Sequence, residues 1–402
     1  MSKSYPLKKY ADFVSEKIST KDITVLEYVT TDSILQNKQG VTVASSMPAQ
    51  NTKITKYSKS DILLGNIRPY LKKIWFANRN GGCSADVLAI RAKENINPTF
   101  LYYALFRDDF FNYVMQGSKG TKMPRGDKNQ IMEFSIPDLS KAEQTNIATV
   151  LEAIDAKIEL NNLINSQLES LAKALYDYWF VQFDFPDANG KPYKADGGKM
   201  EYNRLLRREI PLGWKQGSLW EIANYFNGLA MQKYRPKGNE FLPVIKIKEM
   251  GEGFSSQTEK ASPSIPIDAV VDDGDILFSW SATLEVKIWA NGKGALNQHI
   301  FKVTSKTHPK FFYFFELKNY LNHFKMMANL RKTTMGHITQ DHLKQSLICI
   351  PPDYLLSRAK DQIEPIFEKH LLLEKENQKL MALRDWLLPI LMNGQINFLN
   401  LD

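Results

Sequence analysis

The chain has 402 residues, 43% of them hydrophobic, and a formal net charge of +8. This length exceeds one ordinary domain and suggests two or three. No run of 18 apolar residues is present, and the first ten residues lack an apolar stretch after their lysines, so neither a membrane span nor a secretory leader is expected. The two cysteines, Cys83 and Cys349, are too few for a disulfide scaffold or a Cys-rich zinc site, and they favour a cytoplasmic location.

The positive charge is confined to two blocks of similar size. Residues 1–140 carry 20 Lys and Arg against 13 Asp and Glu, and residues 186–356 carry 23 against 17. Residues 141–185 are acidic, with 3 basic against 7 acidic side chains, and residues 357–402 are nearly neutral, with 6 against 7. Two basic blocks favour a polyanionic partner such as nucleic acid.

The two basic blocks repeat one pattern. A shift of 214 residues aligns "SDILLGNIRPYLKKIW" (60–75) with "GDILFSWSATLEVKIW" (274–289), which share their ends but differ in the middle. Likewise "NPTFLYYAL" (97–105) resembles "HPKFFYFFEL" (308–317). Ordered matches along nearly a half-chain predict a duplicated module. Each copy is expected to hold alternating strands, an aromatic-rich helix and a Pro-terminated strand, followed by a long helix.

Both long helices carry a heptad stripe. The first is expected to begin after Asp138, with Ser140 and Glu143 as a capping box. Its stripe contains Ile147, Leu151, Ile154, Ile158, Asn161, Asn165, Leu168, Ala172, Leu175 and Trp179. The second contains Ile363, Ile366, His370, Leu373, Asn377, Leu380, Arg384, Leu387 and Leu391. Two matching stripes predict an antiparallel coiled coil with one module at each end. The alternative is that each helix faces its own module's core.

The second helix contains Pro365, which is expected to kink it or delay its start. About 35 helical residues give a rod of about 50 Å, comparable with about 15 base pairs of duplex DNA. The expected fold class is therefore α+β, with two duplicated mixed α/β domains separated by an antiparallel coiled coil. The expected segments are 1–140 (first domain), 141–183 (first spacer helix), 184–213 (linker), 214–356 (second domain), 357–392 (second spacer helix) and 393–402 (tail).

The most distinctive stretch is "LYDYWFVQFDFPDANGKPYKADGGKMEYNRLLRREIPLGWK" (175–215). It resembles the central conserved region of specificity subunits of type I restriction–modification systems. Segments 136–161 and 387–396 resemble the two conserved helices of that family. The resemblance implies that the two duplicated mixed α/β domains are target recognition domains, each reading one half of a bipartite DNA site. It also implies that the helices dock two methyltransferase (M) subunits and, through them, the restriction (R) motor subunits. S-adenosylmethionine, ATP and Mg²⁺ are then expected on the partner subunits and none on this chain.

A self-contained nuclease or methyltransferase, or a stand-alone duplicated DNA-binding regulator, is the alternative. Amino-methyltransferases use an Asn/Asp-Pro-Pro-aromatic loop, and the one Pro-Pro here lies in "CIPPDY" (349–354). Asp275, Glu285 and Lys287 have the spacing of a metal-dependent nuclease, but Leu71 stands at the position of Glu285 in the first copy. Asp61 and Asp275 are therefore expected to begin strands after turns. No catalytic or metal-binding residue is predicted, and no phosphate-binding loop is present.

The DNA-contacting residues are expected in basic loops, because phosphates attract Lys and Arg and base edges are read by Arg, Lys, Asn and Gln. Loop 116–130 supplies Lys119, Lys122, Arg125 and Lys128, and its counterpart, 328–342, supplies Arg331, Lys332 and Thr333. The variable middle of the first repeat supplies Arg68 and Lys72, and segment 228–239 supplies Lys233 and Arg235. Partner docking is assigned to Tyr178, Trp179, Phe180 and Trp386, with core packing as the alternative for these aromatic residues.

Overall fold

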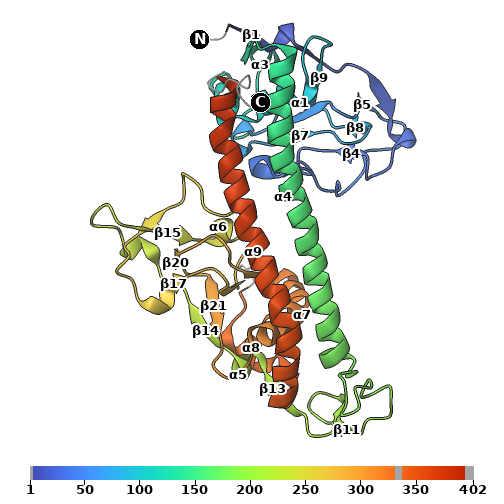
Figure 1. Cartoon of the computed structure of the whole chain (residues 1–402), viewed down its shortest axis with the longest axis vertical. Coiled ribbons are helices and arrows are strands. Elements are labelled where there is room, and N and C mark those ends of the chain that lie inside the picture. The colour runs from blue at the N-terminus through green and yellow to red at the C-terminus, as the bar shows by residue number, and fades with distance from the viewer. Residues whose placement is uncertain (1–2, 331–336, 394–402) are drawn as a thin grey trace, which may run out of the picture. The chain divides into compact units, whose positions relative to one another are not determined.

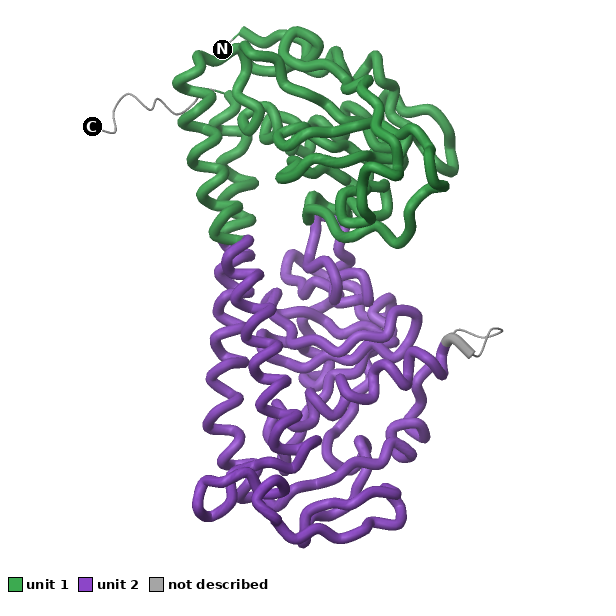
Figure 2. The backbone as a smooth tube through the Cα atoms, turned by 90° about the vertical axis from the view of Figure 1, so that its right-hand side faces the viewer, with its two compact units in different colours: residues 1–158, 380–402 green, residues 159–379 purple. Residues whose placement is uncertain are grey.

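The computed structural model describes residues 3–330 and 337–393. The chain divides into two compact units, residues 1–158 with 380–402, and residues 159–379 (Figure 2). Each unit holds one module and part of both long helices. Among the described residues, no helix has the length and apolar character needed to cross a bilayer.

The first module contains two four-stranded sheets. One has the order β2-β9-β6-β7 and is antiparallel throughout; the other has the order β3-β5-β8-β4. A short pair, β1 with β10, joins the ends of the module. The strands are β1 (Ser4–Pro6), β2 (Ala11–Phe13), β3 (Lys17–Ser19), β4 (Tyr28–Val29), β5 (Lys53–Tyr57), β6 (Ile62–Gly65), β7 (Ile74–Phe76), β8 (Gly81–Cys83), β9 (Val87–Ala92) and β10 (Ser135–Pro137). The helices are α1 (Pro98–Phe106), α2 (Asp108–Gln116) and α3 (Lys128–Met132).

The second module has sheets of order β14-β21-β18-β19 and β16-β15-β20-β17, with the pair β13–β22 at its ends and a separate hairpin, β11–β12. Its strands are β11 (Met200–Asn203), β12 (Arg208–Pro211), β13 (Lys215–Ser218), β14 (Asn224–Asn227), β15 (Leu242–Ile245), β16 (Lys260–Ala261), β17 (Val270–Val271), β18 (Ile276–Ser279), β19 (Glu285–Ile288), β20 (Gly294–Leu296), β21 (Ile300–Thr304) and β22 (Leu347–Ile350). Its helices are α5 (Leu219–Ile222), α6 (Ile247–Glu252), α7 (Lys310–Leu330) and α8 (Gln340–Gln345).

The two modules share their topology, as the repeat predicts. The sheet β2-β9-β6-β7 corresponds strand by strand to β14-β21-β18-β19. In the second sheet, β8 is parallel to β4 and antiparallel to β5, just as β20 is parallel to β15 and antiparallel to β17. The fourth strand differs, because β3 joins β5 whereas β16 joins β15. The copies therefore extend this sheet on opposite edges.

The aspartates that begin the repeated stretches are framework residues. A carboxylate oxygen of Asp61 accepts the backbone N–H of Ser58 at 2.7 Å, and Asp275 accepts that of Asp272 at 2.9 Å. Each closes the turn before its strand, β6 or β18. Asp61 also pairs with Arg91 at 2.8 Å, and Asp275 pairs with Lys302 at 3.0 Å. The expectation that they begin strands after turns is confirmed.

The long helices are α4 (Lys141–Tyr176), continued by a π-helical turn (Asp177–Val181), and α9 (Asp353–Met392). The predicted capping box is present, since Glu143 accepts the Ser140 N–H at 2.8 Å and Ser140 Oγ accepts the Glu143 N–H at 3.3 Å. Helix α9 begins at Asp353, so Pro365 does not delay its start.

The two helices pair in antiparallel fashion within each unit. In the second unit, Asn161 contacts Asn377 and the later Asn165 contacts the earlier Glu374. In the first unit, Ile147 and Leu151 of α4 share a core with Leu388 and Leu391 of α9. The stripes therefore serve both predicted purposes, because they pair the helices and also close the module cores (Figure 1).

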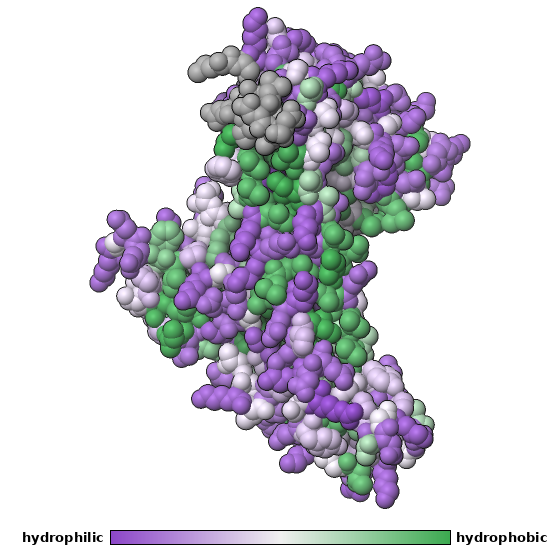
Figure 3. Space-filling view, in the orientation of Figure 1, coloured by the Kyte–Doolittle hydropathy of each residue, from purple (hydrophilic) through white to green (hydrophobic). Residues whose placement is uncertain are grey.

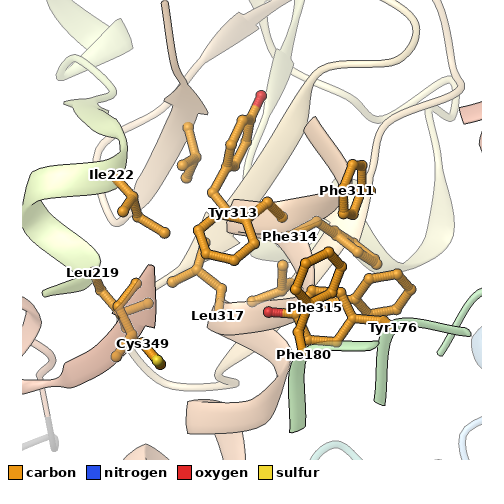
Figure 4. Packing of buried hydrophobic residues seen from close by; sticks show 14 of the residues in the cluster. Tyr176, Phe180, Leu219, Ile222, Phe311, Tyr313, Phe314, Phe315, Leu317 and Cys349 are labelled. Carbon is orange, nitrogen blue, oxygen red and sulfur yellow. The ribbon is translucent and has the colours of Figure 1, made fainter. Parts of the chain in front are cut away.

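The core of the second unit is aromatic. Phe311 and Phe315 of α7 pack against Tyr176 at the end of α4 and Phe180 in the π-helical turn (Figure 4). Phe312 of α7 contacts the same two rings. Ring centroids lie 5.0 to 6.4 Å apart, the range of favourable aromatic pairs. Each buried ring contributes about 1.5–3 kcal/mol through removal from water, so this cluster anchors the module to the long helices.

Candidate nucleic-acid interface

Two candidate segments of the first module lie side by side. Ile67 forms an isolated antiparallel bridge with Arg125. The Arg68 N–H donates to the Pro124 carbonyl at 2.8 Å, and the Gly126 N–H donates to the Asn66 carbonyl at 3.2 Å. A Cβ at Gly126 would lie 2.8 Å from Asn66 Oδ1, so glycine permits this close approach. Loops 66–72 and 116–130 therefore form one basic surface.

A third segment, the turn before β9, completes this surface. The Asn66 N–H donates to the Asp86 carbonyl at 2.9 Å. The Arg125 guanidinium pairs with Asp86 Oδ1 at 3.0 Å. Asn66, Asp86 and Arg125 are thus joined in one arrangement, which we call the first frame. Arg125 was predicted from the sequence, whereas its carboxylate partner was not.

Four other candidate residues of the first module fall into two groups. Arg68, Lys122 and Lys128 are exposed, and the described part of the chain offers their side chains no hydrogen-bond or ion-pair partner. Lys119 pairs with Asp127 at 3.0 Å but is 83% exposed. These four side chains remain open to a polyanion.

Lys72 is placed differently. It pairs with Asp108 at 2.7 Å, and Lys38 pairs with the same carboxylate at the same distance. Burial tends to raise the pKa of Asp108, but hydrogen bonds from the two lysines outweigh it and lower that pKa. Because Asp108 begins α2, Lys72 takes part in a structural ion-pair network at a helix N-terminus.

The second module has the same frame with other side chains. The Trp280 N–H donates to the His299 carbonyl at 3.2 Å, and the Ile338 N–H donates to the Trp280 carbonyl at 3.0 Å. The Trp280 ring lies 5.1 Å from the His299 ring and 5.4 Å from the His337 ring, centroid to centroid. Trp280, His299 and His337, the second frame, therefore occupy the places of Asn66, Asp86 and Arg125.

The candidate segment 228–239 begins at this second frame. Trp280 Nε1 donates to Asn227 Oδ1 at 2.9 Å. The next residue is Gly228, where a Cβ would lie 2.1 Å from the Asn297 carbonyl oxygen, so glycine is required for this approach. Lys233 is exposed, and Arg235 lies 4.0 Å from Glu259. The remaining candidates, Arg331, Lys332 and Thr333, lie outside the described residues.

The comparisons with known proteins agree with this duplicated arrangement. A family model described as the type I restriction modification DNA specificity domain matches twice, over residues 7–170 and 211–380. The chain belongs to the type I restriction–modification DNA specificity family. As a specificity subunit it is a DNA-recognition component of a restriction–modification complex and does not catalyse the reaction.

Two relatives match along nearly the whole specificity subunit. One is the type I restriction enzyme MjaIX specificity subunit of Methanocaldococcus jannaschii, 24% identical over 94% of this chain and 86% of its own. The other is the HindI specificity subunit of Haemophilus influenzae, 24% identical over 98% of this chain and 99% of its own. The crystal structure of a type I S subunit from M. genitalium has a TM-score of 0.54 at 15% identity, covering 97% of this chain and 96% of that one, so the fold is shared.

The predicted docking residues of the specificity subunit separate into two pairs. Trp179 and Phe180 are each only 4% exposed and belong to the aromatic core of the second unit. Their assignment to docking is therefore corrected, because both rings are buried in this core, where Phe180 contacts α7 and Trp179 contacts Phe180. Tyr178 and Trp386 are 39% and 63% exposed, and their docking role stays a prediction.

The three residues with nuclease-like spacing do not converge. Asp275 pairs with Lys302, Lys287 donates to the Met250 carbonyl at 3.1 Å, and Glu285 lies opposite Ser279 at the other end of the β18–β19 pair. Across residues 3–330 and 337–393, no three His, Cys, Asp or Glu side chains are grouped so as to hold a metal ion.

Proposed function

We propose that this specificity subunit recognises a two-part, gapped DNA sequence, with each module reading one half. The observation that carries the proposal is the pair of frames. The same backbone hydrogen bonds support Asn66, Asp86 and Arg125 in one module and Trp280, His299 and His337 in the other. Shared backbone hydrogen bonds with different side chains are what two related readers of different sequences require, because base edges are distinguished by side-chain chemistry.

The charge around the frames supports DNA as the ligand. Arg68, Lys119, Lys122 and Lys128 are exposed around the first frame, and Lys233 and Arg235 follow the second. Lysine and arginine contacts to phosphates release counterions, so binding should weaken steeply as salt rises. These residues supply affinity and orientation in the proposal, whereas the frames supply sequence discrimination.

The long helices supply the proposed docking surface for the M subunits, and through them the R subunits. Apolar residues gather over these helices in the space-filling view (Figure 3). In the first unit, Trp386 is exposed together with Met381 and Leu383. Exposed aromatic residues flanked by aliphatic ones are typical anchors of protein interfaces. In this proposal S-adenosylmethionine, ATP and Mg²⁺ bind to the partner subunits.

Methylation mapping tests the proposal. Genomic DNA is compared between cells that carry the intact gene with its M partner and cells from which only this gene is deleted. The expected result is a gapped motif, methylated at adenine on both strands and lost on deletion. Persistence of the same motif after deletion, or an ungapped motif, would contradict the proposal.

The alternative functions are tested with the purified chain alone. It is incubated with DNA, Mg²⁺ and S-adenosylmethionine at stoichiometric concentration. Cleavage or methyl transfer by the isolated chain would favour a self-contained enzyme. Tight sequence-specific binding without any partner would favour a stand-alone regulator, whereas the proposal expects tight binding only with the M subunits.

A further inference from the structure

Of the two candidate arginines in the first module, Arg125 is the one whose guanidinium is held by an ion pair while its side chain stays exposed. Its guanidinium pairs with Asp86 at 3.0 Å, while its side chain remains 59% exposed and that of Asp86 38% exposed. Arg68, Lys122 and Lys128 are exposed, and no hydrogen bond or ion pair in the described part of the chain holds their side chains. A side chain that is oriented before binding loses less conformational freedom on contact.

The backbone at Arg125 is fixed from two directions. Its N–H and carbonyl form a reciprocal pair of 2.9 Å hydrogen bonds with Lys119. On the other side it bridges Ile67, and the hydrogen bonds of its neighbours Pro124 and Gly126 hold the loop against residues 66–68. Asp86 is fixed in turn, because its carbonyl accepts the Asn66 N–H. Both members of the ion pair are therefore positioned by the fold.

The chemistry of this pair indicates a particular base. A guanidinium has five N–H donors in a rigid planar fork, so one carboxylate contact leaves others available. Guanine presents two acceptors, O6 and N7, to the major groove, and a bidentate arginine matches them. Building on the proposed function, we propose that Arg125 reads a guanine in the half-site of the first module and that Asp86 is its positioning residue.

The second module supplies an internal comparison. At the places of Asp86 and Arg125 it has His299 and His337, which lie against Trp280 instead of forming an ion pair. The guanidinium contact therefore belongs to one half-site. Arg68, Lys122 and Lys128 are assigned to phosphates, because a phosphate contact tolerates a flexible cation whereas a base-specific contact requires a defined direction.

The test uses cells carrying this chain with its M partner, with methylated motifs mapped genome-wide. The variants are Arg125→Gln, Arg125→Lys and Asp86→Asn, and Lys122→Gln and Lys128→Gln serve as matched loop controls. We expect Arg125→Gln to reduce discrimination at one guanine by roughly 5- to 150-fold while the other half-site is unchanged. Asp86→Asn should reduce discrimination at the same guanine, but to a smaller degree. The controls should lower methylation at all sites alike.

Several outcomes separate this inference from the proposed function. Absence of a gapped motif with the unchanged chain would contradict the proposed function itself. A gapped motif that Arg125→Gln leaves unchanged, or relaxes at a base other than guanine, would overturn the inference alone. If Arg125→Gln does not accumulate as folded protein, Arg125→Lys decides: it retains the charge but lacks the fork, so unchanged guanine discrimination in that variant would also overturn the inference.

Discussion

Asn161 of α4 and Asn377 of α9 meet side chain to side chain in the second unit, with Asn161 Nδ2 donating to Asn377 Oδ1 at 2.9 Å. Both residues are almost fully buried, at 0% and 3% exposure. Asn377 Nδ2 also donates to Asn162 Oδ1 at 2.8 Å. The amide N–H groups of buried asparagines in a helix seam find these partners in one register only, so this pair fixes the alignment of the two helices at a cost in stability.

Replacing one member of this pair should therefore lower the free energy of unfolding more than replacing both. We expect Asn161→Leu to lower the free energy of unfolding by about 1–3 kcal/mol, because Asn377 Oδ1 then loses its donor in a buried seam. The double change Asn161→Leu with Asn377→Leu should recover most of that loss. Urea unfolding followed by circular dichroism measures both. A double variant less stable than either single variant would contradict the pairing.

In the first unit, Arg384 of α9 bonds to Asp155 of α4 at 2.8 Å, and the Tyr103 hydroxyl donates to the same carboxylate at 2.8 Å. The Arg384 side chain is 12% exposed. We expect Arg384→Met to lower the free energy of unfolding by about 3 kcal/mol, because it leaves Asp155 partly buried without a counter-charge.

The matched control for Arg384→Met is Lys56→Met, which removes a cation from an exposed pair with Glu16 in the same unit. It should change stability by less than about 1 kcal/mol. Equal effects of the two changes in the same urea experiment would show that the Arg384 pair is not special.

Glu316 of α7 makes the stability of the second unit depend on pH. Burial raises its pKa to about 7, although the hydrogen bond from the Tyr176 hydroxyl opposes this. The folded chain therefore retains a proton that the unfolded chain has lost, and stability falls as pH rises from about 4.5 to about 7, by at most about 3 kcal/mol.

Glu316→Gln tests this dependence because glutamine accepts the Tyr176 hydroxyl without a charge. Its stability relative to the unchanged chain should increase across that pH range and remain constant above it. Glu368→Gln, at an exposed position of α9, is the control and should follow the unchanged chain at every pH. If the stability of Glu316→Gln and that of the unchanged chain changed with pH at the same slope, the pH dependence would not arise from Glu316.

Trp280 is the side chain through which the second frame is best tested. We expect Trp280→Ala to weaken DNA binding of the assembled complex roughly tenfold, because a large ring at the centre of an interface contributes more than about 1 kcal/mol. Binding is measured by fluorescence anisotropy on DNA that carries the mapped motif. Tyr354→Ala, which removes an exposed ring of the same unit, should leave affinity unchanged; a similar loss in both variants would argue against a specific role for Trp280.

Several features could be predicted because they depend on residues close in sequence. The capping box needs only Ser140 and Glu143, three positions apart, and the heptad stripes need only a regular spacing. The strand starts at Asp61 and Asp275 follow from turn chemistry, where a carboxylate accepts a nearby backbone N–H. The duplication was visible because both copies retain the residues that fill the core.

Other features could not be predicted, because they depend on contacts between distant segments. Trp179 and Phe180 have the composition of docking residues, and both are buried in a core that includes distant segments such as α7, more than 120 residues later in the chain. Nor does the sequence indicate which edge of the second sheet accepts a fourth strand. Both edges expose equivalent backbone donors and acceptors, and β3 and β16 pair with opposite edges of the sheet.

The sequence by itself determined that this specificity subunit has two related modules, two paired helices and basic loops at matched places, because period, spacing and composition are local quantities. Only the tertiary structure decided which loop residues meet. Asp86 and Arg125 are 39 positions apart in the sequence, and His299 and His337 are nearly as far apart. Their convergence depends on backbone hydrogen bonds between loops at the ends of paired strands, where the register of those strands places each side chain beside a partner that no local pattern specifies.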